Sequence, residues 1–348
     1  MLGFMSERLS SWEKIKQSGR EVVVYGMGNG ADKVLDEFAR LDIKVRGVTA
    51  SDSFVRGQSF RGFTVQKLSE FNGDFIIAVA FASCIPEVME HIYSLCDKYR
   101  VLVPAVPVCG SEIFNREFVE RNSERLMQAH SLFTEDSKKI YAGCVDFMFG
   151  GELDTLRNIT TPKSEAFKGF FKPRSDEDYL DLGAYRGDTV VELLRYSGGS
   201  YGSITALEPD KKTFAKLTAH LSGMKNITLL QKAIAAREGI VGFSGAAGRQ
   251  SAISDKGIPT EATSIDSLSR EQRFTYIKMD VEGGELEALK GAKETLKRDR
   301  PRLNIALYHR SEDIFTLPLT VKELNPDYEF HLRRHPYIPC WDMNMYCV

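Results

Sequence analysis

The chain has 348 residues, of which 43% are hydrophobic and 27% are charged, and its formal net charge is −2. At roughly 150 residues per domain, this length predicts two domains. The near-neutral charge argues against bulk nucleic-acid binding, which needs a basic domain or stripe. The longest apolar stretches, such as 75–82 and 101–108, fall short of the roughly 18 residues that a membrane helix requires, so we expect no membrane span.

The first residues and the cysteines bear on the compartment. Glu7 and Glu13 interrupt the N-terminus, which has no apolar core of the signal-peptide kind, so we expect a cytoplasmic protein. The cysteines form no C-x-x-C pair and no zinc-finger spacing, which favours reduced thiols over zinc ligands or disulfides. They are Cys84, Cys96, Cys109, Cys144, Cys340 and Cys347.

The first 110 residues alternate between strand and helix patterns. Strands are expected at 21–25, 44–48, 74–81 and 101–103, and helices at about 31–41 and 86–96. This alternation predicts a parallel, doubly wound, Rossmann-like domain over residues 1–110. Residues 111–170 show apolar residues at helical spacing and predict a helical connector. From 171 to 308 strands and helices alternate again, and 328–332 with 343–347 predict an antiparallel hairpin that ends a second Rossmann-like domain, residues 171–348.

The turn after the first strand matches the dinucleotide-binding pattern G-x-G-x-x-A at Gly26, Gly28 and Ala31. The acid that should follow the second strand and bind a ribose is missing there, and Asp52 comes a few residues late. Three hypotheses stay open for this domain. It can act as a nicotinamide or nucleotide-sugar site through Gly26, Gly28 and Gly30, it can sense a ligand, or it can serve as a docking or oligomerising scaffold.

A second glycine turn, 183–187, lies between a strand at 179–182 and a helix that begins at Asp188. Glu208 ends the next strand about 20 residues later, where a dinucleotide-type fold places the acid that accepts ribose hydroxyls. The middle glycine of G-x-G-x-x-G is missing, and Asp181 precedes the first glycine by two residues. Because a carboxylate there repels a pyrophosphate and suits a cation, S-adenosylmethionine fits this turn better than a dinucleotide.

These motifs resemble those of the FkbM family of methyltransferases. The family's Asp-x-Gly-Ala-x-x-Gly-Asp-Thr is similar to 181–189, its Glu-Pro-Asp to 208–210, and its Lys-x-Asp-x-Glu-Gly-x-Glu to 278–285, with Gly291 and Ala292 further along. The similarity covers roughly 130–348. It implies a class I methyltransferase fold, S-adenosylmethionine as cofactor, and a hydroxyl acceptor on a sugar, glycan precursor or polyketide-like molecule. The cofactor residues that it implies are Asp181, Gly183, Ala184, Tyr185, Gly187, Asp188, Thr189, Glu208, Pro209, Asp210, Ala233 and Ile234.

Four polar residues follow or end predicted parallel strands, namely Asp181, Glu208, Asp280 and His309, so we expect them at one edge of the sheet. His309 is the first candidate for the base that takes the proton of an alcohol acceptor, and Asp280 is the alternative. Asp280 with a neighbouring carboxylate could instead hold a divalent metal, but no spacing in the chain demands one, and we predict none. We expect Glu282 and Glu285 to serve the N-terminus of the following helix.

The remaining expectations concern basic residues, the overall function and the assembly. Lys278 is expected to pair with a nearby acid or to face away from the site, and the basic cluster 333–335 is expected to form a solvated face. The function favoured by the motifs is S-adenosylmethionine-dependent O-methylation of a small-molecule or glycan hydroxyl, without nucleic acid as partner, and a homodimer is a hypothesis for the assembly. The alternatives are an enzyme that acts through the N-terminal glycine turn and a non-catalytic binding protein.

Overall fold

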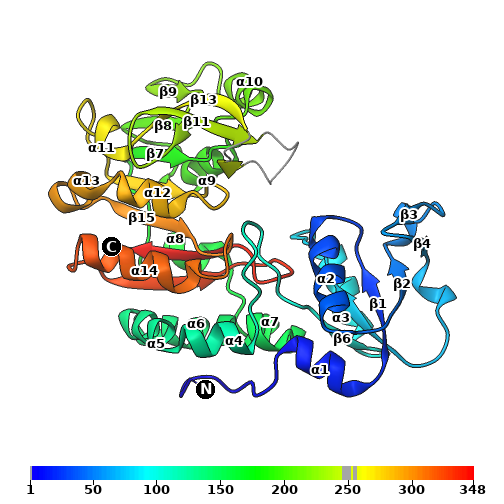
Figure 1. The fold of residues 1–348 in the computed structure, drawn as a ribbon. Coiled ribbons are helices and arrows are strands. Elements are labelled where there is room, and N and C mark those ends of the chain that lie inside the picture. The colour runs from blue at the N-terminus through cyan, green and yellow to red at the C-terminus, as the bar shows by residue number, and fades with distance from the viewer. Residues whose placement is uncertain (1, 245–251, 254–256) are drawn as a thin grey trace.

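The computed structural model describes residues 2–244, 252–253 and 257–348, which form two lobes around two large β-sheets (Figure 1). The first lobe holds the N-terminal sheet. The second holds the C-terminal sheet, and a layer of helices from the middle of the chain lies along it (Figure 1).

The first sheet has six strands in the order β3-β4-β2-β1-β5-β6. All pairs are parallel except β3 with β4. The predicted strands are present, whereas β3 and β4 were not predicted. The strands are β1 (Glu21–Tyr25), β2 (Val45–Thr49), β3 (Ser59–Phe60), β4 (Phe63–Gln66), β5 (Phe75–Val79) and β6 (Arg100–Leu102), and the helices are α1 (Ser11–Ser18), α2 (Asn29–Arg40), α3 (Pro86–Leu95) and the 3-10 turns Asp52–Phe54 and Leu68–Glu70.

The predicted helical connector consists of five helices. They are α4 (Arg116–Arg121), α5 (Ser123–Leu132), α6 (Glu135–Gly150), α7 (Leu153–Asn158) and α8 (Lys163–Lys168). The longest, α6, is buried along most of its length and ends where Gly151 adopts a left-handed conformation, with φ of 69°.

The second sheet has seven strands in the order β16-β17-β15-β14-β7-β8-β9. Only β17 runs antiparallel to its neighbours β15 and β16, which confirms the predicted hairpin. The strands are β7 (Asp178–Leu182), β8 (Ser203–Leu207), β9 (Ile227–Leu230), β14 (Tyr276–Met279), β15 (Arg302–Ala306), β16 (Phe330–Arg334) and β17 (Met343–Cys347), and the helices are α9 (Asp188–Ser197), α10 (Lys211–His220), α11 (Ile265–Leu268), α12 (Glu285–Lys290), α13 (Lys293–Arg298) and α14 (Asp313–Leu324).

The expected alternation of strands and helices is interrupted between β9 and α11. A small sheet takes the place of a crossover helix there, in the order β10-β13-β11-β12. Its strands are β10 (Ala233–Ile234), β11 (Gly239–Ser244), β12 (Ala252–Ile253) and β13 (Ile258–Thr263). Because β10 follows β9 directly, Ala233 and Ile234 lie next to the carboxyl ends of the large sheet.

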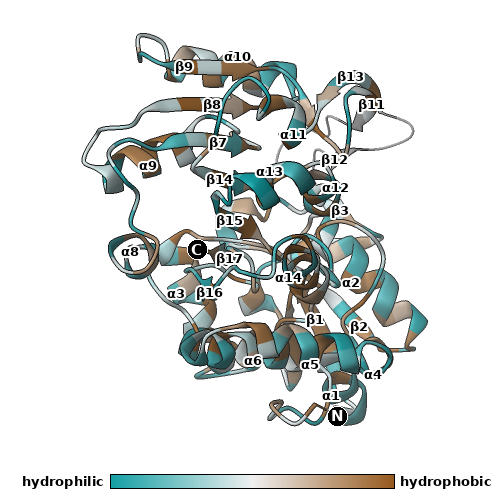
Figure 2. Cartoon of the chain, turned by 90° about the vertical axis from the view of Figure 1, so that its left-hand side faces the viewer, coloured by the Kyte–Doolittle hydropathy of each residue, from teal (hydrophilic) through white to brown (hydrophobic). Residues whose placement is uncertain are grey.

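One continuous apolar cluster joins the two lobes. Val23 and Ile77 of the first sheet, Phe147 of α6, and Leu180 and Ile305 of the second sheet all belong to it. Separate clusters cover the other face of each sheet, with Val22 and Val24 on the first, since neighbouring strand residues point to opposite sides. Figure 2 shows the corresponding pattern of brown strands and a largely teal outer helix α13. The predicted domain boundaries at 110 and 170 do not separate independent cores, and they stay predictions.

Three features expected from the sequence are the missing membrane span, the free cysteines and a solvated face at 333–335. Among the helices that the structure describes, none is long and apolar enough to cross a membrane. All six cysteines are free thiols. The solvated face expected at 333–335 is wrong, because Arg333, Arg334 and His335 are buried. They lie on and directly after the edge strand β16 of the hairpin, where Arg333 pairs with Glu165 and His335 contacts Tyr346.

Candidate active site

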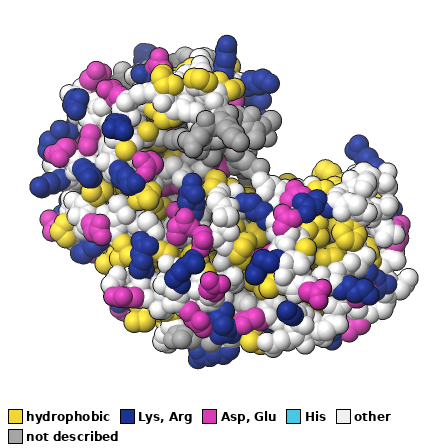
Figure 3. Space-filling model, viewed as in Figure 1, with side chains coloured by type: hydrophobic (Ala, Val, Ile, Leu, Met, Phe, Trp, Pro, Cys, Tyr) yellow, Lys and Arg dark blue, Asp and Glu magenta, His cyan; other side chains and the backbone are white. Residues whose placement is uncertain are grey.

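A cavity of about 330 Å³ lies at the carboxyl ends of the strands of the second sheet. The space-filling view shows the surface hollowed between the two lobes (Figure 3). Most of the predicted site residues line the cavity, namely Gly183, Tyr185, Asp188, Thr189, Glu208, Pro209, Asp210, Ala233, Ile234 and Asp280. Asp181, Ala184, Gly187 and His309 do not line the cavity. Each of them either neighbours a lining residue in the sequence or contacts one.

The turn after β7 owes its shape to close packing. Gly183 has φ of 78°, and a Cβ there would lie 1.9 Å from the carbonyl oxygen of Asp280. Only glycine therefore allows the ends of β7 and β14 to approach each other. Gly187, with φ of 86°, is the N-cap of α9. It packs against Leu217 of α10 and against Leu221, which directly follows α10. The turn thus brings Tyr185 and the first residues of α9 to the cavity.

Asp181 lies beneath this turn and is completely buried. Its Oδ2 accepts a hydrogen bond from the hydroxyl of Thr189, and its Oδ1 lies 3.7 Å from Nζ of Lys278. Oδ1 has no hydrogen-bond partner. Burial raises the pKa of Asp181, and Lys278 and Thr189 only partly offset this. Its contacts hold Thr189 and Lys278 in place at the cavity wall.

Glu208 follows β8 and is held by backbone N–H groups. Tyr185 N donates to Oε2 at 3.1 Å, and Asp210 N donates to Oε1 at 2.9 Å. Burial raises the pKa of Glu208 to about 7 despite these bonds. Asp210 in turn is the N-cap of α10, where its Oδ1 accepts from Thr213 N at 2.8 Å. The carboxylate predicted to bind ribose hydroxyls is therefore fixed in orientation on the wall of the cavity.

Asp280 follows β14 and reaches the cavity with 32% of its side chain exposed. Oδ2 lies 3.7 Å from Nζ of Lys278, and the hydroxyl of Tyr308 donates to Oδ1 at 3.2 Å. Burial alone would raise the pKa of Asp280, but Lys278, His309 and Tyr308 outweigh it and hold the pKa below its usual range. Asp280 is thus ionised, and Lys278 pairs with acids as expected.

His309 lies behind Asp280 and is completely buried. Nε2 is 3.3 Å from Oδ1 of Asp280 and 3.5 Å from Oε2 of Glu282, and Nδ1 is 2.9 Å from Oε1 of Glu285. These are ion pairs without the alignment of hydrogen bonds. Burial would lower the pKa of His309, but Glu285 and Asp280 raise it well above the usual value. The imidazole therefore carries two protons and a positive charge near neutral pH.

The two glutamates of the β14–α12 connection have different positions. Glu285 is buried at the start of α12, where Oε1 also accepts from Val281 N at 2.8 Å. Glu282 has a left-handed backbone, with φ of 52°, and its side chain lines the cavity. Burial, with the charges of Asp280 and Glu285, raises the pKa of Glu282 to about 7 against the effect of His309. Glu285 thus lies in the first turn of α12 as expected, whereas Glu282 faces the cavity, and its expected place at the N-terminus of this helix is wrong.

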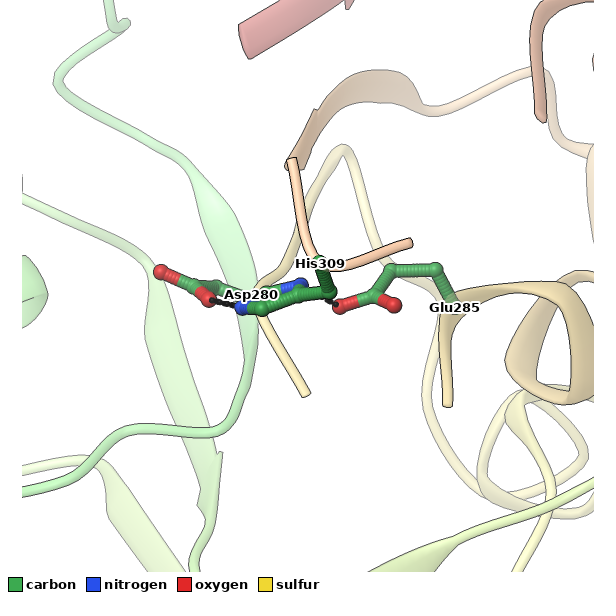
Figure 4. A group of neighbouring side chains, drawn as sticks. All are labelled: Asp280, Glu285 and His309. Carbon is green, nitrogen blue, oxygen red and sulfur yellow. Dashed lines mark ion pairs between the residues drawn. The ribbon is translucent and has the colours of Figure 1, made fainter. Parts of the chain in front are cut away.

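Asp280, Glu285 and His309 also bring three potential metal ligands within 4.8 Å of one another. Figure 4 shows the imidazole ring between the two carboxylates. Because each carboxylate faces a different ring nitrogen, an ion bound to one nitrogen would have the second carboxylate on the other side of the ring. Asp280 and Glu285 therefore do not bind one ion together with this ring, and the three side chains form a carboxylate–imidazolium–carboxylate triad.

The far end of the cavity holds residues that the sequence did not indicate. Lys163 of α8 lies 3.0 Å from Glu192 and 3.6 Å from Asp342, and these carboxylates raise its pKa although burial would lower it. Tyr337 and Trp341 come from the connection between β16 and β17. No motif marks that connection. The only available signal was the density of aromatic and polar residues between two predicted hairpin strands.

Comparison with known proteins identifies the second lobe. Residues 181–337 match the family model of the methyltransferase FkbM domain. This part of the chain is similar to FkbM methyltransferases. The match confirms the family resemblance and the prediction of a methyltransferase enzyme. None of the curated proteins matches the sequence.

The FkbM methyltransferase of Methylobacillus flagellatus has the same fold. Its crystal structure has a TM-score of 0.75 and 18% sequence identity, and the match covers 99% of this chain and 95% of that chain. This confirms the predicted fold class. Fibrillarin of Aeropyrum pernix in complex with S-adenosyl-L-methionine (TM-score 0.34, 16% identity, 51% and 67% covered) and an rRNA methylase of Streptococcus thermophilus (0.33, 14%, 50% and 87%) are more distant.

Proposed function

We propose that the FkbM domain transfers a methyl group from S-adenosylmethionine to a hydroxyl of a sugar, glycan precursor or other small molecule. The observation that carries this proposal is the charge of the cavity, which seven carboxylates and three lysines line. Such a wall suits a cationic cofactor and repels a pyrophosphate. The oriented carboxylate of Glu208 also fits a ligand that carries ribose hydroxyls.

In this proposal the residues of the first two motifs hold the cofactor. Gly183, Tyr185 and Thr189 contact its methionine part, and Glu208 accepts hydrogen bonds from the ribose hydroxyls. Pro209, Asp210, Ala233 and Ile234 flank the adenine. Asp181, Ala184 and Gly187 act from behind the wall, since Asp181 holds Thr189 and Lys278, and the other two shape the turn.

S-adenosylmethionine, when bound, supplies a methyl group activated by its sulfonium. The chain then has to orient the acceptor oxygen and take its proton. We place the acceptor hydroxyl between Asp280 and Glu282, because both carboxylates line the cavity and His309 does not. Glu282 receives the proton, since its pKa of about 7 suits a base at neutral pH. The products are the methylated acceptor, S-adenosylhomocysteine and a proton on Glu282.

His309 is not the base in this scheme, although its position after β15 suggested that role. An imidazole that already carries two protons and is completely buried cannot take the acceptor proton directly. We assign it the role of a positioning residue that holds Asp280 and Glu282 on one side and Glu285 on the other. No metal takes part in this scheme. The cytoplasmic location and the homodimer stay predictions.

A ligand panel read by thermal shift tests the cofactor assignment. A ligand at 100 times its dissociation constant adds about 2.7 kcal/mol to the stability of the protein that binds it, or roughly 4 °C for a chain of 348 residues that unfolds as one unit. We expect S-adenosylmethionine or S-adenosylhomocysteine to raise the melting temperature and NADH to leave it unchanged. A shift with NADH alone would favour an enzyme that acts through the N-terminal glycine turn. The acceptor is then sought by screening hydroxylated sugars for release of S-adenosylhomocysteine.

A further inference from the structure

A second cavity, of about 500 Å³, lies between the two lobes. Its walls include Gly28 and Gly30 at the start of α2, Phe81 and Ala82 after β5, and Val106 after β6. It shares Val108, Tyr337 and Trp341 with the cavity of the methyltransferase lobe. The two cavities are therefore neighbours, and these three residues line both of them.

The N-terminal glycine turn beside this cavity is explained by packing. A Cβ at Gly26 or at Gly30 would lie 2.9 Å or 2.8 Å from the carbonyl oxygen of Ala80. Two of the three glycines are thus needed for the contact between this turn and the end of β5. A Cβ at Gly28 would meet nothing within 4 Å, so only this glycine leaves space on the cavity side or toward solvent.

The second cavity has no charged side chain among the described residues that line it. Its walls are mostly aliphatic and aromatic, with proline and glycine backbone between them. A dinucleotide or nucleotide sugar brings two negative charges and needs an acid for its ribose, and β2 ends at Thr49 with Ala50 next. An uncharged, apolar ligand suits these walls better.

The N-terminal lobe also holds the shared wall in place. Ser83 and Ile338 exchange two backbone hydrogen bonds, of 2.7 Å and 2.9 Å, which tie the loop after β5 to the connection that carries Tyr337 and Trp341. Cys109 N donates to the carbonyl of His309 at 2.8 Å, and its Sγ donates to the carbonyl of Glu282 at 3.1 Å. The lobe that forms the second cavity therefore contacts the residues that face the acceptor.

We propose that the second cavity is the outer half of the acceptor site and binds an uncharged apolar body, an aliphatic chain or an aromatic ring system, attached to the hydroxyl-bearing part that is methylated. This inference rests on the proposed function, since that function places the hydroxyl at Asp280 and Glu282. Trp341 and Tyr337, with Tyr308 next to Trp341 at 6.0 Å between ring centroids, separate the hydroxyl-bearing part from the apolar body. The N-terminal lobe then selects the acceptor by the length of its apolar part.

The test uses binding of alkyl β-D-glucosides, from methyl to heptyl, to the full chain saturated with S-adenosylhomocysteine. They combine a hydroxylated head with an uncharged tail of variable length. In calorimetry we expect the affinity to increase about fourfold per methylene, which corresponds to ~0.8 kcal/mol for each buried CH₂. Gly28→Phe and Ala82→Phe, both at residues that line the second cavity, should remove this length dependence. Gly3→Phe is the matched control, since Gly3 also has open space around its Cβ but is far from the cavity in sequence and not on its wall.

Several results would overturn the inference. Equal affinity along the series in the unmodified chain would do so, as would a length dependence that persists in both cavity variants, provided that circular dichroism shows them folded. NADH binding that Gly28→Phe abolishes would assign the cavity to a dinucleotide. Because these titrations involve no transfer, they separate the two proposals. Length-dependent binding without any affinity for S-adenosylmethionine would refute the proposed function and leave the apolar cavity assigned.

Discussion

Replacement of Glu282 by glutamine tests the acceptor half of the site most directly. Glutamine keeps the size of the side chain and can still bond an acceptor hydroxyl, but it cannot take the proton. A positioned base contributes about 10²–10⁴ to the rate, so we expect turnover to fall by at least about a hundredfold while the affinity for S-adenosylmethionine changes little. The assay is release of S-adenosylhomocysteine with the acceptor found by screening.

The pH dependence gives a second reading of the same residue. The base must be deprotonated, and with a pKa of about 7 the carboxylate of Glu282 is ionised in about a tenth of molecules at pH 6 and in most at pH 8. Turnover should therefore rise almost tenfold over this range and level off above it. The positive charge of a bound sulfonium stabilises the carboxylate of Glu282, so the midpoint of the pH profile should lie at about 7 or lower. Glu282→Gln should lose this pH dependence.

The matched control is Glu287→Gln, an exposed acid of α12 paired with Lys290 at 2.6 Å. It should keep the turnover and the pH profile of the unmodified chain. The fold should survive in both variants. Because burial raises the folded pKa of Glu282 from 4.5 to about 7, the stability that its protonated form contributes is lost between about pH 4.5 and pH 7. Glu282→Gln should therefore not melt earlier than the unmodified chain at pH 8. Nearly normal turnover in Glu282→Gln would refute its role as base.

The other predictions concern the cofactor half and the turn. Glu208→Ala should weaken S-adenosylmethionine binding tenfold or more, because each charge-assisted hydrogen bond contributes about 1.5 to 3 kcal/mol, and wild-type affinity in calorimetry would exclude the ribose role. In the unmodified chain this affinity should fall as pH drops below about 7, where Glu208 becomes protonated, and a flat profile would contradict its involvement. Gly183→Ala should lower the free energy of unfolding by clearly more than Gly198→Ala, since both have positive φ, of 78° and 74°, but only Gly183 meets the backbone of Asp280; urea unfolding compares them. A chelator such as EDTA should leave turnover unchanged, and recovery of lost activity on adding Mg²⁺ would establish a metal.

The features of this molecule that could be predicted are those that depend on residues close together in the sequence. The strands at 21–25 and 179–182 have apolar runs followed by glycine turns, and the motif acids Glu208 and Asp280 directly follow their strands. Since the carboxyl ends of parallel strands lie at one edge of the sheet, sequence position alone predicted that these acids lie at the same edge. The two-residue strand β3 and the small sheet around β10 give too little pattern for such a prediction.

Other features depend on contacts between distant segments. The protonated state of His309 results from Glu285 and Asp280 enclosing it, and its place after a strand carries no information on that. Lys163 and Trp341 reach the cavity from α8 and from the hairpin connection, where no motif distinguishes them from ordinary surface residues. Burial of Arg334 likewise follows from the packing of the hairpin between the helices and the rest of the sheet.

The apolar cluster that joins both sheets has a consequence for how the protein melts. When two lobes share one core, opening either of them exposes the side chains of the other, so both should unfold together. Calorimetry should then record a single peak, and a ligand in one lobe should delay the melting of both. Fragments cut near residue 110 or 170 would expose the apolar faces of Ile77 and Phe147 and tend to aggregate. A chimera with another methyltransferase domain would need to exchange helices α4–α7 together with the C-terminal lobe, because these helices cover it.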